Sequence, residues 1–284
     1  MSITRMKTIV DEIRHLRPWP PVALRVIQLS REPSVLPNDL VEVLQTDAAL
    51  TARVLKLCNS AYYGFQRQVA SLQEAGNRLG SQALVHLVLT TCVERAFEGN
   101  SSITPARARR LWERSIMNAL SASHLAMIHG EIDRNVAYTA GLLCNFGHLV
   151  LDAHLEELRD EIQAYRSAGV DMLEAERAAV GLDHGQIAGR MMRRWNFPEA
   201  LVDAVEHHHA PERAAVDPQL AAITHLGEAM THAVALGEGL DGLAYQLSDK
   251  ALGLTGLTHA RLAALEDSLM AELQRARQLV QSAA

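Results

Sequence analysis

The chain has 284 residues, of which 48% are hydrophobic, 21% charged and only 4% aromatic, a composition that favours an aliphatic, helical globular protein. The net charge of -6 argues against a nucleic-acid binder. No stretch reaches the roughly 18 apolar residues of a membrane span, and residues 1–5 lack the apolar run of a signal peptide, so we expect a cytoplasmic protein. The densest basic run, Arg107, Arg109, Arg110 and Arg114, is interpreted as a solvated helix face.

Helical periodicity runs through nearly the whole chain, and start and stop signals divide it into many short helices. In the first half, Asp47 is placed to cap a helix that continues to residue 61. Ser81 is placed to cap a helix that runs to residue 97, and Asp133 to cap the one after the loop.

The second half carries similar signals. Asp183 and Gln186 have capping-box spacing, Pro198 and Pro218 suit first helical turns, and Thr258 is placed to cap a last helix. No stretch alternates like a strand, so we predict an all-α fold. The weakest seams are residues 99–104, 210–217 and 237–257, and the last is Gly-rich and typical of a connection.

The three cysteines, Cys58, Cys92 and Cys144, are odd in number and lie in apolar helical contexts. This pattern predicts reduced, buried thiols. Cys144 is therefore predicted to be inert rather than a nucleophile.

Four blocks of sequence resemble HDOD domains in their order and spacing: residues 16–24, 47–64, 71–80, and 184–198 followed by His207-His208. The second block, which runs from Asp47 through Tyr62-Tyr63-Gly64, is long and specific. The resemblance implies a compact multi-helix HD-like domain over residues 16–211. Residues 212–284 would form a C-terminal helical extension that packs on the same domain.

HDOD domains are an offshoot of the HD phosphohydrolases, whose His and Asp residues bind divalent metals that activate water. The resemblance places Arg114, the pair Cys144-Asn145 and Glu228 at those metal-binding positions. An arginine repels a cation, and asparagine is a weak, uncharged ligand. We therefore expect no catalytic residue, no bound metal and no cofactor.

Three histidines, His184, His207 and His208, occupy positions that resemble accessory ligands of related HD phosphodiesterases. With Arg114, Cys144, Asn145 and Glu228 they define what we call the relict pocket. The run 207–209 has three open interpretations: favourable contacts with a helix end, a pocket wall, or a metal site.

Further expectations concern side chains around this pocket. Arg114 is hypothesised to fill the vacated metal position and to pair with Glu228. His148 and His154, which follow the Cys144 segment, are expected to have surface or capping roles.

Gly64 is flanked by the aromatic residues Tyr62, Tyr63 and Phe65. This pattern predicts an aromatic turn between helices. Two alternatives remain open for this turn, packing in the core or a lip that binds a partner.

The resemblance implies a non-catalytic bacterial regulatory module that acts in signal transduction by protein–protein interaction. Expected partners are signalling proteins, such as those of cyclic-dinucleotide or two-component systems, with no nucleic acid and no membrane. One alternative is a sensor that binds a phosphorylated ligand or nucleotide in the relict pocket. The other is a residual metal-dependent phosphohydrolase.

Overall fold

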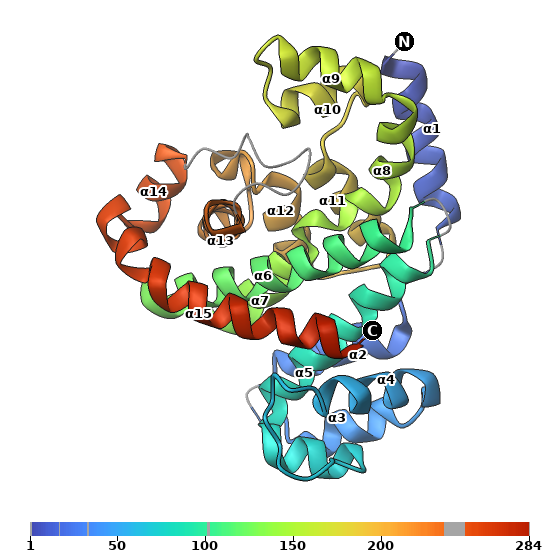
Figure 1. The fold of residues 1–284 in the computed structure, drawn as a ribbon, viewed down its shortest axis with the longest axis vertical. Coiled ribbons are helices and arrows are strands. Elements are labelled where there is room, and N and C mark those ends of the chain that lie inside the picture. The colour runs from blue at the N-terminus through green and yellow to red at the C-terminus, as the bar shows by residue number, and fades with distance from the viewer. Residues whose placement is uncertain (1, 17, 33, 101–102, 236–247, 284) are drawn as a thin grey trace.

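The computed structural model describes residues 2–16, 18–32, 34–100, 103–235 and 248–283, and this part of the chain is helical without any strand (Figure 1). The prediction of an all-α fold is confirmed. The α-helices are α1 (Ser2–His15), α2 (Pro21–Ser30), α3 (Pro37–Leu44), α4 (Ala48–Cys58), α5 (Leu72–Glu98), α6 (Pro105–His129), α7 (Arg134–Leu143), α8 (His148–Glu157), α9 (Arg159–Ser167), α10 (Met172–Val180), α11 (His184–Arg194), α12 (Glu199–His207), α13 (Pro218–Ala235), α14 (Asp249–Thr255) and α15 (His259–Ala283). Two short 3-10 helices, η1 (Cys144–Gly147) and η2 (Pro211–Arg213), join α7 to α8 and follow α12.

Helix α6 forms the centre of the packing, with α7 and α13 as its most extensive neighbours. Thr104 caps it, Pro105 opens its first turn, and Gly130 ends it with a left-handed backbone. A Cβ atom at Gly227 would lie 2.8 Å from the Ala122 backbone nitrogen, so only glycine allows α13 to cross α6 this closely. This close crossing brings the residue that follows, Glu228, into the interior.

Most of the predicted helix starts appear where expected. Asp47 accepts a hydrogen bond from the Leu50 amide, Asp133 caps α7, and Thr258 accepts one from the Arg261 amide. Asp183 and Gln186 form the predicted capping box, because each side chain binds the other residue's backbone amide.

The predicted start of a helical stretch at Ser81 holds, because the backbone breaks from helical geometry at Gly80, but the predicted capping role of the Ser81 side chain is wrong. Ser71 caps α5 by accepting a hydrogen bond from the Glu74 amide, and α5 then continues to Glu98 through a kink at Gly80. Gly80 has φ 79°, a backbone that favours glycine, and the helix resumes immediately after it. Ser81 instead donates its hydroxyl to the Val35 carbonyl.

The C-terminal helices pack on the rest of the molecule. Helix α13 contacts α6 and α12. Helix α15, drawn in red in Figure 1, runs across one face of the molecule and contacts α6 and α4. The division into residues 16–211 and 212–284 stays a prediction. Of the expected seams, residues 101–102 and 237–247 lie outside the described part of the chain, and α14 occupies most of the remainder of 237–257.

An aromatic cluster ties the N-terminal entry to the segments around the site. Trp19 lies 5.1 Å from Phe146, 5.8 Å from Trp195 and 5.6 Å from Phe197, measured between ring centroids. Phe146 also contacts Phe97 and is fully buried. No helix in the described ranges is long and apolar enough to cross a bilayer.

Candidate functional site

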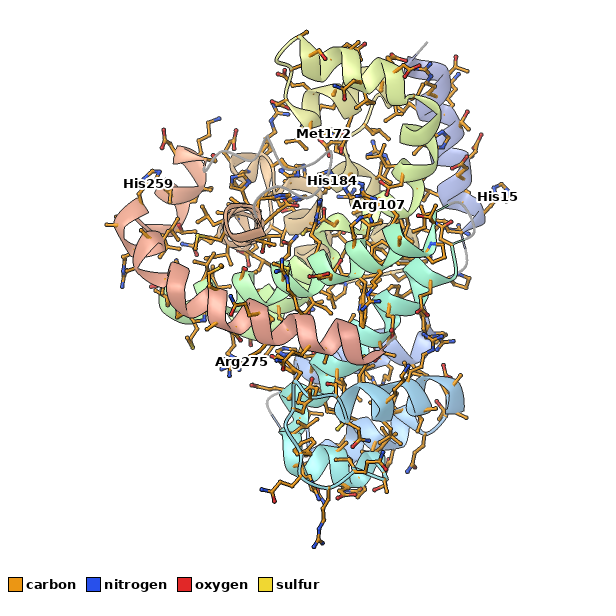
Figure 2. The ribbon with its side chains drawn as sticks, viewed as in Figure 1. His15, Arg107, Met172, His184, His259 and Arg275 are labelled. Carbon is orange, nitrogen blue, oxygen red and sulfur yellow. The ribbon has the colours of Figure 1, made fainter. Side chains whose placement is uncertain are left out.

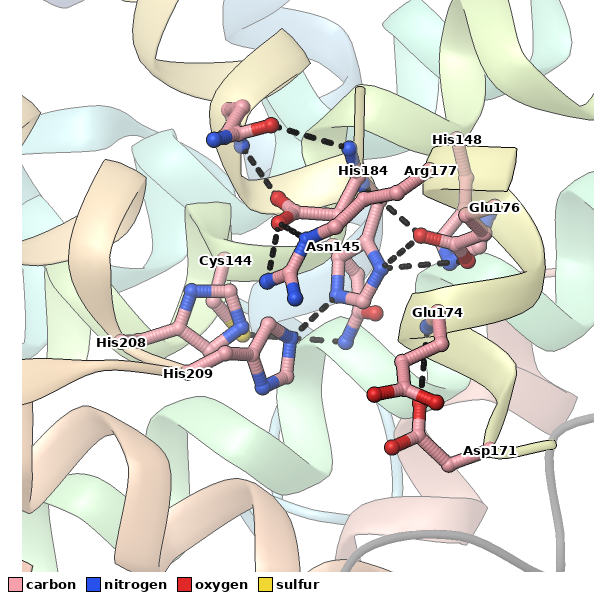
Figure 3. Close-up of polar contacts among 12 residues, drawn as sticks. Cys144, Asn145, His148, Asp171, Glu174, Glu176, Arg177, His184, His208 and His209 are labelled. Atoms are coloured by element: carbon pink, nitrogen blue, oxygen red, sulfur yellow. Dashed lines mark hydrogen bonds and ion pairs between the residues drawn. The ribbon is translucent and has the colours of Figure 1, made fainter. Parts of the chain in front are cut away.

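Four buried side chains from three parts of the chain converge in the interior. His184 opens α11, His208 and His209 directly follow α12, and Glu228 lies midway along α13. Figure 2 labels His184 in the middle of the molecule, and Figure 3 shows its ring beside those of His208 and His209. We call these four residues the His–Glu cluster.

The side-chain nitrogen and oxygen atoms of the cluster point at one another. The Nε2 atoms of His184 and His209 are 2.9 Å apart. The Oε2 of Glu228 is 3.1 Å from His208 Nε2 and 3.7 Å from His209 Nε2. One such atom from each of the four residues lies within 4.8 Å of all the others, and no side chain is more than 4% exposed.

Outer hydrogen-bond partners fix two of the imidazole rings. His184 Nδ1 lies 3.0 Å from Glu176 Oε2, and His208 Nδ1 lies 2.7 Å from the Val205 carbonyl oxygen. A Cβ atom at Gly185 would lie 2.9 Å from the His208 ring, so a glycine at this position leaves room for the ring. With the Nδ1 atoms engaged, the Nε2 atoms are left to face Glu228.

The residues of the cluster shift one another's pKa values. Burial would raise the pKa of Glu228, but His208, His209 and His184 outweigh it and hold the pKa well below its usual range. Burial, together with His208, lowers the pKa of His209 well below its ordinary value. For His184, burial opposes Glu176 and Glu228, which prevail and raise its pKa to about 9. Glu228 is therefore ionised and His209 neutral at pH 7.

A second buried group adjoins the cluster through His148. Its side chain is 1% exposed, its ring stacks on His184 with centroids 4.8 Å apart, and its Nδ1 lies 2.8 Å from Asp152. The expectation of a surface or capping role for His148 is therefore wrong. The cause is the close approach of Gly147, where a Cβ atom would lie 2.0 Å from the His184 carbonyl oxygen. His154 is only 15% exposed, and its Nε2 lies 3.0 Å from Glu12 Oε2, so it is partly buried rather than on the open surface.

The basic run on α6 is only partly a solvated face. Arg107 binds Asp152 through its Nε, 2.5 Å from Oδ2, and so joins the His148 network. Arg114 is half-buried, whereas Arg109 and Arg110 are exposed. The interpretation of the whole run as solvated is therefore wrong for Arg107 and Arg114, which lie on the inward-turned side of the helix.

The Cys144-Asn145 pair is fully buried in η1. The Cys144 thiol donates a hydrogen bond to the Gly141 carbonyl 3.1 Å away and accepts one from Asn118 Nδ2 at 3.2 Å. Burial, reinforced by Glu228, raises the pKa of the thiol well above its usual range. A protonated thiol is a poor nucleophile and a poor metal ligand. The Asn145 amide contacts the same sulfur at 3.6 Å.

The comparisons with known proteins agree on the fold. The sequence profile of the HDOD domain matches residues 16–211. The chain belongs to the HDOD family. Among solved structures, it resembles an HDOD domain protein of unknown function from Geobacter sulfurreducens, with 24% identity, a TM-score of 0.74 and coverage of 97% and 98% of the two chains.

Other relatives of this HDOD protein span different lengths. A proposed signal transduction protein from Marinobacter aquaeolei has a TM-score of 0.79 and 22% identity, over 99% of this chain and 65% of the other. A proposed phosphohydrolase from Shewanella amazonensis has a TM-score of 0.74 and 22% identity, over 97% and 98%. An uncharacterised protein of Treponema pallidum is 29% identical over 213 residues, 72% of this chain, which spans 40% of that relative's length.

Three of the four positions that the resemblance assigns to the core metal ligands of HD hydrolases, all except Glu228, carry side chains that do not suit a metal ion. There, the thiol of Cys144 is protonated and hydrogen-bonded, Asn145 has no charge, and Arg114 is a permanent cation. The neighbouring His–Glu cluster, in contrast, presents three imidazoles and a carboxylate, the donor types that bind transition metals. These four residues would hold a metal ion, and four protein ligands would leave that ion no open position for substrate or water, so it would support the fold.

The structure separates the sequence-predicted residues of the relict pocket. His184, His208 and Glu228 meet in the cluster, but His207 turns away, 3.0 Å from Asp203, with its side chain 29% exposed. Glu228 lies against His208 and the neutral His209, and a pair between Arg114 and Glu228 stays a prediction.

The sequence-based reasoning missed four residues that build the site, namely His209, His148, Asp152 and Glu176. A signal for His209 existed, because the run 207–209 offers three histidines at a helix end. No local pattern marks Glu176, which reaches His184 from α10.

The aromatic turn lies at a different place in the HDOD fold, beside α15. The rings of Tyr62 and Tyr63 meet edge to face with centroids 5.0 Å apart, and Tyr63 stacks on Phe65 at 6.2 Å. All three side chains are half-buried, so they pack on the core and also remain partly accessible. Tyr62 and Tyr63 border a cavity of about 390 Å³, whose further lining includes His86, Arg134, Tyr138, Met127 and Glu272.

Proposed function

We propose that this HDOD protein is a non-hydrolytic regulatory module that transmits a signal by docking a protein partner. The observation that carries the proposal is the state of the Cys144-Asn145 pair. At the positions that the resemblance assigns to the metal-binding His and Asp of HD hydrolases, this chain has a buried, protonated thiol and a neutral amide. Neither group binds a catalytic metal or takes a proton from water.

The aromatic turn is the proposed docking element. Tyr62, Tyr63 and Phe65 offer rigid aromatic surface that is only half-buried, and Arg78 stacks over the Phe65 ring at 5.2 Å. Tyrosine and arginine are enriched among residues that dominate binding energy at interfaces. The name of the Marinobacter relative, a proposed signal transduction protein, points the same way.

The test compares variants of the partly accessible turn with a matched control. Tyr62→Ser and Phe65→Ser remove aromatic surface from the turn, whereas Leu36→Ser changes an apolar side chain that is 62% exposed elsewhere. Each full-length variant is used as bait against candidate signalling proteins from the host, and dissociation constants are measured for those that bind wild type. We expect both turn variants to weaken binding at least tenfold, about 1.4 kcal/mol, and Leu36→Ser to leave it unchanged. Equal binding by all variants would contradict docking at the turn.

A second candidate function is a small-ligand sensor, and the cavity beside the turn favours it. Its volume of about 390 Å³ falls in the range of ligand sites. His86 stacks on Tyr138 with ring centroids 3.7 Å apart, and its buried Nε2 finds no hydrogen-bond partner in the described part of the chain. Arg134 adds a cation to the lining, which suits a planar ligand with an anionic group.

This second candidate differs from the sensor predicted at the relict pocket, since no residue of the His–Glu cluster lines this cavity. Thermal-shift measurements against a nucleotide panel test it. A ligand of this cavity should raise the melting temperature of wild type, and Arg134→Gln should reduce the shift. A shift that Arg134→Gln leaves intact would contradict binding there.

A further inference from the structure

We infer that His184, His208, His209 and Glu228 form a closed, tetrahedral site for a structural transition-metal ion, with Zn²⁺ the best match. This site goes beyond the proposed regulatory function and does not depend on it. It also departs from our sequence-based expectation that the chain holds no metal.

The spacing of the donor atoms supports a shared ion. Four ligands at 2.0–2.1 Å from a tetrahedral zinc lie about 3.3 Å from one another. The observed separations among His184 Nε2, His208 Nε2, His209 Nε2 and Glu228 Oε2 are 2.9, 3.1 and 3.7 Å for the three pairs that are in direct contact. These three values bracket the zinc spacing, and the other pairs of donor atoms lie within 4.8 Å, so the donors are close enough for small side-chain movements to bring them onto one ion.

Hydrogen bonding alone accounts poorly for the cluster. His208 Nε2 and both carboxylate oxygens of Glu228 are buried, and none makes a well-aligned hydrogen bond within the described residues. The 3.1 Å contact between His208 and Glu228 is therefore close without good hydrogen-bond geometry. A buried carboxylate without an aligned hydrogen-bond donor destabilises the folded state, and a cation at the centre of the cluster would compensate its charge.

The outer contacts are those expected around metal-bound histidines. Ligating imidazoles commonly hydrogen-bond through their other nitrogen to a carboxylate or a backbone carbonyl. Glu176 holds His184 Nδ1 at 3.0 Å, and the Val205 carbonyl lies 2.7 Å from His208 Nδ1. Both contacts aim Nε2 at the cluster, as Figure 3 shows for the ring of His184.

The donor set identifies the kind of ion and its role. Three imidazoles and one carboxylate suit Zn²⁺ and neighbouring divalent transition metals, whereas Mg²⁺ and Ca²⁺ prefer oxygen ligands. Four protein ligands fill a tetrahedral shell, and their burial leaves no open position for water, so the site is structural. The ion would join α11, the end of α12 and α13.

The first experiment measures the metal content of untagged wild-type protein. The protein is equilibrated with Zn²⁺ and dialysed against metal-free buffer, and we expect about one zinc ion per chain by elemental analysis. Removal of zinc with a chelator should lower the melting temperature, and added Zn²⁺ should restore it. Wild-type protein that keeps less than about a tenth of an equivalent would overturn the inference.

Matched variants localise the ion. His209→Asn and Glu228→Gln should retain at least tenfold less zinc than wild type, while His207→Asn, which changes the neighbouring residue outside the cluster, should retain all of it. Equal loss in His207→Asn and His209→Asn would overturn the assignment.

A spectrum of wild-type protein covers the case in which the buried variants fail to fold. Co²⁺ in place of zinc should give the intense visible absorption of a four-coordinate ion, without the near-ultraviolet charge-transfer band of a thiolate ligand. A thiolate band would assign the metal to Cys144 instead and overturn the proposed ligand set.

Discussion

The Cys144 thiol shows how burial sets the chemistry of a single side chain. Burial raises the pKa of this thiol well above the usual range, although the hydrogen bond that it accepts from Asn118 acts in the opposite direction. The protonated thiol donates to the Gly141 carbonyl. Burial also raises the pKa of Cys58 to about 11 and that of Cys92 to about 12. All three cysteines are buried and outside any disulfide.

Native-state alkylation tests this protonation. Because only the thiolate reacts quickly, we expect no labelling of the three cysteines by iodoacetamide at pH 8 in the native protein. All three should react once the protein is unfolded in denaturant, which serves as the control. Mass spectrometry of peptides would identify the labelled positions, and rapid native labelling of Cys144 would contradict the account.

His86 provides a prediction about pH. Burial and the nearby Arg134 lower its pKa to about 4, against about 6.5 in an unfolded chain. The native state therefore binds fewer protons than the unfolded state between these pH values, and the stability from neutral His86 is lost as the pH falls from 6.5 through 4. His86→Phe keeps an aromatic ring against Tyr138 and removes the titration.

Urea denaturation of both proteins from pH 4 to 8 measures this effect. The free energy of unfolding of wild type, relative to His86→Phe, should stay constant above pH 6.5. It should fall on the order of 2 kcal/mol by pH 4. Parallel pH profiles of the two proteins would show that His86 does not titrate as described.

At the scale of elements, helix caps position the site. Asp183 is buried and caps α11 by accepting a hydrogen bond from the Gln186 amide. Its Oδ2 also pairs with Arg177 Nη2, 2.6 Å away. Because His184 is the first residue of α11, this cap also fixes the backbone position from which the His184 side chain extends. The amide of His184 is in turn bound by Glu176, 2.9 Å away.

Removing the Asp183 cap should lower the free energy of unfolding by more than removing a cap that has no ion-pair partner. Asp183→Ala loses the capping box and the Arg177 pair, so we expect a loss of about 2 kcal/mol in the free energy of unfolding. Asp171→Ala is the control, since Asp171 is exposed and caps α10 through the Glu174 amide alone, worth about 1 kcal/mol. Denaturant titrations compare them, and equal losses would show that the Arg177 pair adds nothing.

The elements also show what the sequence could predict. Caps such as Asp47, Asp133 and Asp183 depend on a few neighbouring residues, and these predictions hold. The choice between His207 and His209 could not be made from sequence. Successive residues at a helix end point in directions about 100° apart, and only the packing of α12 against α13 decides which one turns inward.

At the scale of the whole molecule, contacts between distant segments create the site. Glu176 on α10, His148 on α8 and Glu228 on α13 reach His184 or its partners from separate helices. No sequence pattern marks such contacts, because each depends on close crossings such as that of Gly147 with the His184 backbone. The resemblance to HDOD domains supplied the family and the fold, and the structure supplied the membership of the cluster.

The aromatic cluster around Phe146 should dominate global stability. Phe146 is fully buried and contacts Trp19, Phe97 and Trp195 with ring centroids 5.1 to 5.7 Å apart. Phe146→Ala should therefore cost about 3–5 kcal/mol of unfolding free energy. Leu36→Ala, at an exposed position, should stay within about 0.5 kcal/mol of wild type. Similar melting temperatures for both variants would contradict this view of the core.

The proposed function requires that this protein does not hydrolyse phosphate esters. The direct measurement is turnover by untagged protein loaded in turn with Zn²⁺, Mn²⁺ and Mg²⁺, on phosphomonoester, phosphodiester and cyclic-dinucleotide substrates. We expect rates equal to those of metal and buffer alone, because Cys144 and Asn145 stand where the resemblance places the pair that would hold a catalytic ion and its water. Metal-dependent turnover that Glu228→Gln abolishes would contradict the proposed function.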